Sequence, residues 1–153
     1  MSAVIVSLRV NASPLRAFEV FTQEIGAWWR PNALFRLTPR GDGVLRFENA
    51  ERLVAELPTG KLFEIGRVTS WTPGERLAFT WRQATFSAEQ VTYVDVRFDA
   101  VGDETRVTVE HRGWDTIPQD HAARHGFPLQ VFQLRQAEHW RALLAAMSAR
   151  VAG

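Results

Sequence analysis

The stretch from Leu129 to Val151 reads LQVFQLRQAEHWRALLAAMSARV and predicts a long amphipathic helix. Apolar positions recur there at spacings of three and four residues, which places them on one side of an α-helix. This stripe consists of Leu129, Phe132, Gln136, Trp140, Leu143, Met147 and Val151. Charged side chains lie on the opposite side of the helix. Because an aromatic-rich stripe needs a cover, we expect the rest of the chain to pack against it as a sheet.

The residues before this helix predict a strand, a helix and an antiparallel meander. Val4 to Val10 alternate as a strand, and Ser13 followed by Pro14 predicts a helix start whose helix ends at Gly26. Residues 27–35, AWWRPNALF, predict a packed turn or short helix. Further strands are expected at about 44–48, 52–57, 61–71, 76–83, 91–100 and 105–114. Their short connections favour antiparallel neighbours.

The segment from Asp115 to Pro128 has a less regular pattern. A short helix through Ala122, Ala123 and Arg124 fits between Asp120 and Gly126. We expect this segment to fold over one end of the sheet. It would then cover Val131 and Leu134, two apolar residues on the polar side of the last helix; alternatively, these two residues mark a homodimer contact.

Composition and charge restrict the class of protein. With 153 residues and 46% hydrophobic residues, residues 1–153 are expected to form a single domain. A net charge of +1 without a basic cluster argues against nucleic acid as the main partner. The absence of cysteine excludes disulfides and thiolate chemistry. No signal-like segment or membrane-spanning run is present, so we expect a cytoplasmic protein.

Several phrases resemble the activator of heat shock protein 90 ATPase homologue-like group of the START and SRPBCC superfamily. They are SPLRAFEVFT from residue 13, IGAWWRP from residue 25, GRVTSWTPGERLAFTW from residue 66 and VDVRFDAVGDETRVTVEHRGW from residue 94, together with Trp140. The resemblance covers essentially the whole chain. It implies an α+β helix-grip fold, in which a curved antiparallel sheet of about seven strands wraps around the C-terminal helix with a cavity between them. It does not imply chaperone activation.

No complete catalytic or metal-binding motif is present. Glu110 and His111 are neighbours in a strand and point to opposite faces, so they do not form a dyad, and a structural or cavity-lining role of His111 is favoured over a general base. His121 and His125 have a spacing that suits a metal on a helix, but HAARH lacks an acidic third ligand. The serines have no nucleophile motif. We therefore predict no catalytic residue, no metal and no cofactor.

The aromatic residues give the strongest functional signal. The chain has six tryptophans and ten phenylalanines, more than a small core requires. Gln136 is a long amide on the buried stripe, with Trp140 one turn later, and this suits an apolar pocket with a few polar groups. The predicted ligand-binding residues are Trp29, Phe79, Trp81, His111, Phe132, Gln136 and Trp140. Further polar atoms are expected from Arg46, Glu64, Arg67 and Asp95, unless these face water.

Three functions agree with these features. The first is binding of a small, apolar or lipid-like ligand between sheet and helix, without catalysis. The second is an enzyme of the polyketide cyclase or aromatase type, which the same superfamily contains; paired titratable residues in the cavity would favour it. The third is an interaction protein that acts on a chaperone or another partner, and a large exposed apolar patch would favour it.

Overall fold

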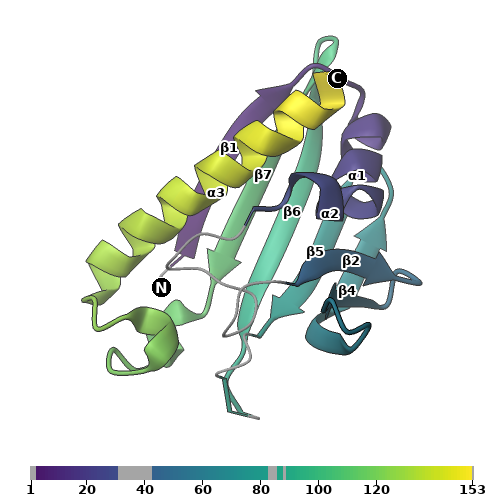
Figure 1. The fold of residues 1–153 in the computed structure, drawn as a ribbon. Helices are drawn as coiled ribbons and strands as arrows, with labels where there is room; N and C mark the ends of the chain where they lie inside the picture. Colours follow the sequence, from purple (N-terminus) through teal and green to yellow (C-terminus); the bar gives the residue numbers. More distant parts are fainter. Residues whose placement is uncertain (1–2, 31–42, 83–85, 88, 153) are drawn as a thin grey trace.

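Seven antiparallel strands form one curved sheet, and a long C-terminal helix lies across one face of it (Figure 1). The structure is a computed structural model that describes residues 3–30, 43–82, 86–87 and 89–152. The strands are β1 (Ala3–Val10), β2 (Val44–Glu48), β3 (Arg52–Glu56), β4 (Leu62–Thr72), β5 (Arg76–Trp81), β6 (Thr92–Val101) and β7 (Glu104–Arg112). The helices are α1 (Pro14–Gln23), α2 (Ile25–Trp28) and α3 (Leu129–Ala152), with short 3-10 helices η1 (Trp114–Thr116) and η2 (Ala122–Arg124). The predicted helix-grip architecture is confirmed.

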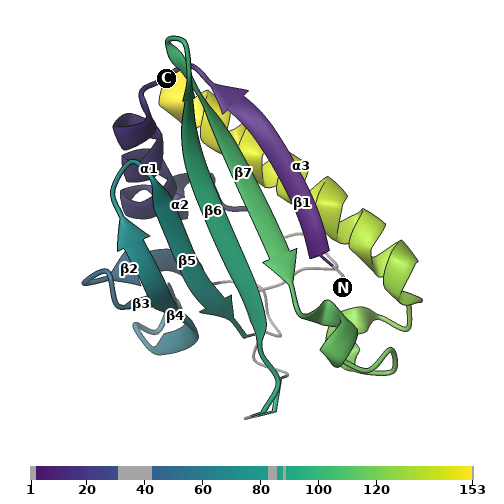
Figure 2. The ribbon, with the colours of Figure 1, turned by 180° about the vertical axis from the view of Figure 1, so that it is seen from behind.

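The strand order is β1-β7-β6-β5-β4-β3-β2, so β2 to β7 form the predicted meander and β1 closes the far edge beside β7. Seen from behind, the sheet lies in front of all three α-helices, which therefore share one face (Figure 2). Two register irregularities occur, one in the β3–β4 pair and one in the β4–β5 pair. Such bulges bend a sheet locally, and here both involve β4.

The start of α1 follows its sequence signals, but its end does not. Ser13 accepts a hydrogen bond of 3.2 Å from the backbone N–H of Arg16, and Pro14 is the first helical residue. The prediction that Gly26 ends this helix is wrong, because α1 ends at Gln23 and Gly26 lies inside α2. A Cβ at Gly26 would lie 2.8 Å from the backbone oxygen of Leu45, so glycine permits close contact between α2 and β2. Of the packed turn or short helix predicted over residues 27–35, only 27–28 belong to α2; residues 31–35 lie outside the described residues.

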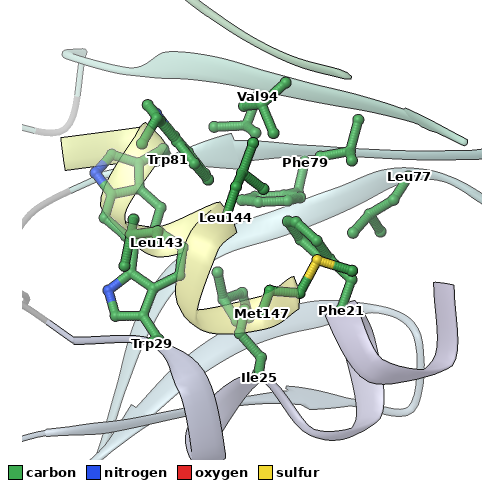
Figure 3. Packing of buried hydrophobic residues seen from close by; sticks show 14 of the residues in the cluster. Phe21, Ile25, Trp29, Leu77, Phe79, Trp81, Val94, Leu143, Leu144 and Met147 are labelled. Carbon is green, nitrogen blue, oxygen red and sulfur yellow. The ribbon is translucent and has the colours of Figure 1, made fainter. Parts of the chain in front are cut away.

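The core lies between the helices and the inner face of the sheet. From α3 it receives Phe132, Trp140, Leu143, Leu144 and Met147, all buried. Figure 3 shows Leu143, Leu144 and Met147 packed against Phe79, Trp81 and Leu77 of β5 and against Phe21, Ile25 and Trp29. The predicted stripe is therefore on the correct face, and Leu144 and His139 widen it.

The segment before α3 folds into η1 and η2, so the predicted short helix is a 3-10 turn. Its Arg124 guanidinium lies 5.3 Å from the ring of Phe132, on the buried side of α3. The expectation that this segment covers Val131 and Leu134 is therefore wrong. Both side chains face outward, with 40% and 65% of their surface exposed.

Candidate functional site

A small, partly open cavity lies between α3 and the inner face of the sheet. It is lined by Trp29, Trp81, His111, Trp114, Gln136, His139 and Trp140. These residues come from the end of α2, the end of β5, the end of β7, η1 and the first half of α3. The cavity volume is about 10 Å³, which is space for about one water molecule. In this structure the rings therefore nearly fill the site.

The indole rings pack against each other in defined orientations. Trp29 stacks on Trp81, with ring centroids 5.4 Å apart and planes 28° apart, and it meets Trp140 edge to face at 5.3 Å. Figure 3 shows the rings of Trp29 and Trp81 beside α3. Trp114 lies 5.3 Å from the ring of His111. Aromatic pairs of this kind form flat, mostly apolar walls.

His111 is the polar centre of the site. Its Nε2 lies 2.8 Å from Oγ1 of Thr92, and that hydroxyl donates its only hydrogen to the backbone oxygen of Trp81 at 3.0 Å. Oγ1 of Thr92 must therefore accept a hydrogen bond from Nε2 of His111, so Nε2 carries the proton of the neutral ring. On the other side of the ring, Nδ1 accepts a hydrogen bond of 3.2 Å from Nε1 of Trp140. The packing thus fixes both the orientation and the tautomer of His111.

Both buried histidines are held in the neutral form. Burial, with a smaller contribution from the nearby His139, lowers the pKa of His111 from its ordinary value of 6.5 to about 3. Burial also lowers the pKa of His139 to about 4. Protonation of Nδ1 in His111 would in addition set two donors against each other, since Trp140 donates to that atom. His111 is therefore poorly suited to act as a general base near neutral pH.

Three buried polar atoms of the cavity residues have no hydrogen-bond partner among the described residues. They are Nε1 of Trp29, Nε1 of Trp114 and Oε1 of Gln136. The amide nitrogen of Gln136 points to Nδ1 of His111 at 3.5 Å, a long contact. This orientation of the amide leaves its oxygen unpaired. An unpaired buried polar group costs about 1 to 3 kcal/mol, so three of them around one cavity require an explanation.

The structure brings together five of the seven predicted ligand-binding residues: Trp29, Trp81, His111, Gln136 and Trp140. Phe79 and Phe132 are buried but do not line this cavity. Phe79 packs against Phe47, with centroids 5.5 Å apart, and Phe132 packs against Trp114 at 4.7 Å. That any of these residues binds a ligand stays a prediction.

The sequence argument did not select Trp114 and His139 for the site. His139 follows Gln136 by three residues and so lies on the same side of α3, a spacing that could have identified it. Trp114 belongs to η1 and turns back toward His111 after Gly113, which has a φ of 101°. That left-handed turn has no clear sequence signal beyond the glycine itself.

The charged strand residues considered for the cavity lie elsewhere. Arg46 pairs with Glu48 at 3.4 Å and with Glu56 at 3.3 Å. Arg67 contacts Glu64 at 3.4 Å. Asp95 forms a bidentate hydrogen-bonded pair with Arg76. None of the four candidate residues lines the cavity, because strand charges remain on the face that water reaches.

His121 and His125 do not share a helix face. His121 is the N-cap of η2, where its Nδ1 accepts a hydrogen bond of 3.0 Å from the backbone N–H of Ala123. His125 follows η2 with a left-handed backbone, φ 53°. Within the described residues, no group of three or more His, Asp or Glu side chains is arranged for a metal ion. No α-helix of the described residues is long and apolar enough to span a membrane.

Comparisons with known proteins agree with this fold. The family model of the activator of Hsp90 ATPase homolog 1-like proteins matches residues 11–150. The search of curated proteins finds no match.

Among solved structures, an HSP90 activator from Plasmodium falciparum is 16% identical with a TM-score of 0.68, and 99% of this chain and 97% of that chain are covered. Protein TTHA0849 from Thermus thermophilus is 20% identical with a TM-score of 0.64 and the same coverage. The AHSA1 protein from Silicibacter pomeroyi is 17% identical with a TM-score of 0.60, covering 99% and 98%. At these identities the structures show the fold alone.

Proposed function

The chain belongs to the activator of Hsp90 ATPase homolog 1-like family, and from this premise we propose that it binds a small, mostly apolar molecule between α3 and the sheet. The proposed site is the cavity around Trp29, Trp81, His111, Gln136 and Trp140, with Trp114 and His139 as further walls. Ligand pockets are typically apolar and aromatic, with a few polar groups that orient the ligand. The lining of this cavity has that composition.

The unpaired polar atoms of Trp29, Trp114 and Gln136 are the observation that carries the proposal. A core that serves stability alone replaces such atoms with apolar groups or pairs them. Leucine in place of Gln136 would remove one unpaired oxygen and keep the apolar stripe. Of the five such atoms in the part of the chain that the structure describes, three belong to residues that line this cavity, and this supports a binding partner there.

Binding requires the site to open, because a volume of about 10 Å³ does not accommodate an organic molecule. The rings best placed to move are Trp81 and His139, which keep 7% and 5% of their surface exposed. Trp81 is the last residue of β5. A side chain at the end of a strand rotates with little disturbance of the backbone hydrogen bonds, so a ligand can displace the Trp81 ring toward solvent.

A cyclase or aromatase role has weaker support. Such an enzyme needs a group that takes or gives a proton near neutral pH. Among the described residues, no carboxylate lines the cavity, and the pKa of both histidines there is far below 7. A ligand-binding or carrier role without catalysis is therefore the function that these features favour.

The proposal is tested by thermal shift and tryptophan fluorescence with a panel of one- and two-ring apolar probes. A ligand that binds only the folded state raises the melting temperature by mass action. We expect Trp140→Ala to weaken tight probes and to admit bulkier ones, because it enlarges the space under α3. Trp140→Phe retains most of the ring volume and controls for loss of the His111 contact. If no probe moves either signal, the ligand-binding proposal is wrong.

Partner binding through the outer side of α3 is the second candidate, and the exposure of Val131 and Leu134 favours it. The structure from Plasmodium falciparum is that of an HSP90 activator, so a chaperone is the other partner to test for this surface. For a second copy of this chain, sedimentation equilibrium of the parent and of Leu134→Arg decides the matter. A homodimer that the variant dissociates supports this surface, whereas a monomeric parent excludes the homodimer.

A further inference from the structure

The walls of the cavity are aromatic or polar but carry no charge. They consist of four indoles, two imidazoles and one amide. Arginine, aspartate and glutamate are absent from the described lining residues, and burial keeps both imidazoles neutral. A buried ion without a counter-charge costs several kcal/mol. The site therefore selects against ligands that are charged at their buried end.

Three buried polar atoms of the described lining residues are left without a hydrogen-bond partner. Thr92 and Trp140 satisfy the two nitrogens of His111, so this ring has nothing left to offer a ligand. Two indole donors remain, from Trp29 and Trp114, and one amide acceptor remains, from Gln136. A hydroxyl group has the complementary capacity, since its oxygen accepts two hydrogen bonds and its hydrogen is donated once.

We propose that the ligand is an uncharged, flat molecule whose buried end carries a hydroxyl group. The hydroxyl oxygen accepts from the indole N–H groups of Trp29 and Trp114, and the hydroxyl hydrogen is donated to Oε1 of Gln136. The flat body of the ligand stacks on the indole walls. This inference rests on the proposed ligand-binding function and specifies its chemistry.

Other head groups match the same atoms less well. A carboxylate has acceptors only, so it sets a negative oxygen against the amide oxygen of Gln136. An ammonium group has donors only and opposes both indole N–H groups. A methyl group leaves all three atoms unpaired and buried. The order of affinity is therefore expected to follow the head group rather than the apolar area of the ligand.

The test compares four one-ring probes by fluorescence titration at pH 7.5: phenol, toluene, benzoate and benzylammonium. Phenol and toluene have nearly the same shape, because a methyl group replaces the hydroxyl. We expect phenol to bind at least about ten-fold more tightly than toluene, as two or three new hydrogen bonds predict. Benzoate and benzylammonium are expected to bind at least about ten-fold more weakly than phenol.

Two variants on α3 assign the effect to the cavity. Gln136→Leu removes the acceptor, and we expect it to reduce the preference for phenol over toluene to about three-fold or less while toluene still binds. Gln133→Leu changes a glutamine on the same helix that does not line the cavity, and it is expected to keep the full preference.

The outcomes separate the inference from the proposed function. If toluene binds as tightly as phenol, if benzoate binds best, or if Gln136→Leu keeps the preference, the hydroxyl inference is wrong and the apolar site remains. If none of the four probes binds the parent protein, the hydroxyl inference is wrong, and if the two-ring apolar probes also fail to bind, ligand binding itself is refuted.

Discussion

Nε1 of Trp140 on α3 donates a hydrogen bond to Nδ1 of His111 on β7 over 3.2 Å, and both side chains are buried. The contact joins the long helix to the sheet at the wall of the candidate site. It also occupies the nitrogen of His111 that would otherwise accept a proton from a substrate. One hydrogen bond therefore supports the helix-grip fold and removes the most obvious general base.

Leu143→Ala tests the packing of α3 on the sheet. Leu143 is fully buried, so the substitution removes apolar contacts and leaves a cavity, with an expected loss of about 2 to 5 kcal/mol in the free energy of unfolding. The control is Leu134→Ala on the exposed side of the same helix, with an expected change within about 0.5 kcal/mol. Urea unfolding measures both. Equal effects of the two substitutions would mean that the wrong face was assigned to the sheet.

Thr92→Val tests the tautomer of His111. At pH 7, nitrogen chemical shifts of the imidazole should show a neutral ring with the proton on Nε2, because Oγ1 of Thr92 accepts there. Valine leaves that N–H without its acceptor, which should cost about 1 to 3 kcal/mol and alter the ring signals. Thr105→Val removes a distant buried hydroxyl that bonds Ala12 and serves as the control. A protonated ring at pH 7, or a proton on Nδ1, contradicts the assignment.

His139→Gln tests the effect of the buried histidines on acid stability. Unfolded histidines bind protons near pH 6.5, whereas in the folded state the pKa is about 3 for His111 and about 4 for His139. Stability is therefore fully present above pH 6.5 and falls between pH 6.5 and 4, by about 1.4 kcal/mol per pH unit for each histidine. His139→Gln removes the contribution of one histidine, so the stability of the variant should fall less steeply between pH 6.5 and 4. Urea unfolding at pH 4 to 7 measures this slope. Parallel stability curves of parent and variant would refute the lowered pKa of His139.

Zinc binding is the subject of a further prediction. His121 uses Nδ1 to cap η2, and His125 lies beyond a left-handed turn, so the two rings do not form one chelating face. We expect no stoichiometric zinc after gel filtration and no change in melting temperature with a chelator. Metal at one equivalent per chain, lost in His121→Ala, would overturn this expectation.

Much of the architecture could be predicted from periodicity and caps, because the signals are local. Helix α3 could be predicted from the apolar stripe between Phe132 and Met147 alone. The start of α1 could likewise be predicted from Ser13 and Pro14 alone. The end of α1 could not be predicted in this way. Gly26 is required by the approach of α2 to Leu45, and that contact is tertiary.

The candidate site was predictable only where its residues lie on a regular element. Gln136 and Trp140 follow from the spacing of α3, whereas Trp114 reaches the cavity through the turn at Gly113. Phe79 has the same inward alternation as Trp81 in β5, yet it packs on Phe47, two residues further from the cavity. A sequence pattern identifies the face of a strand but not the position along it where rings leave space.

The most direct test of the proposed function follows the indole N–H signals in a ¹⁵N-correlated NMR spectrum during addition of phenol. Trp29→Phe and Trp114→Phe assign the two signals whose donors lack partners among the described residues. The internal reference is Trp28, whose Nε1 already donates to the backbone oxygen of Val20 at 2.9 Å. The account predicts saturable shifts of the Trp29 and Trp114 signals, with Trp28 unchanged. Saturable shifts confined to Trp28 and Trp71, which do not line the cavity, or none at all, would contradict a ligand site between α3 and the sheet.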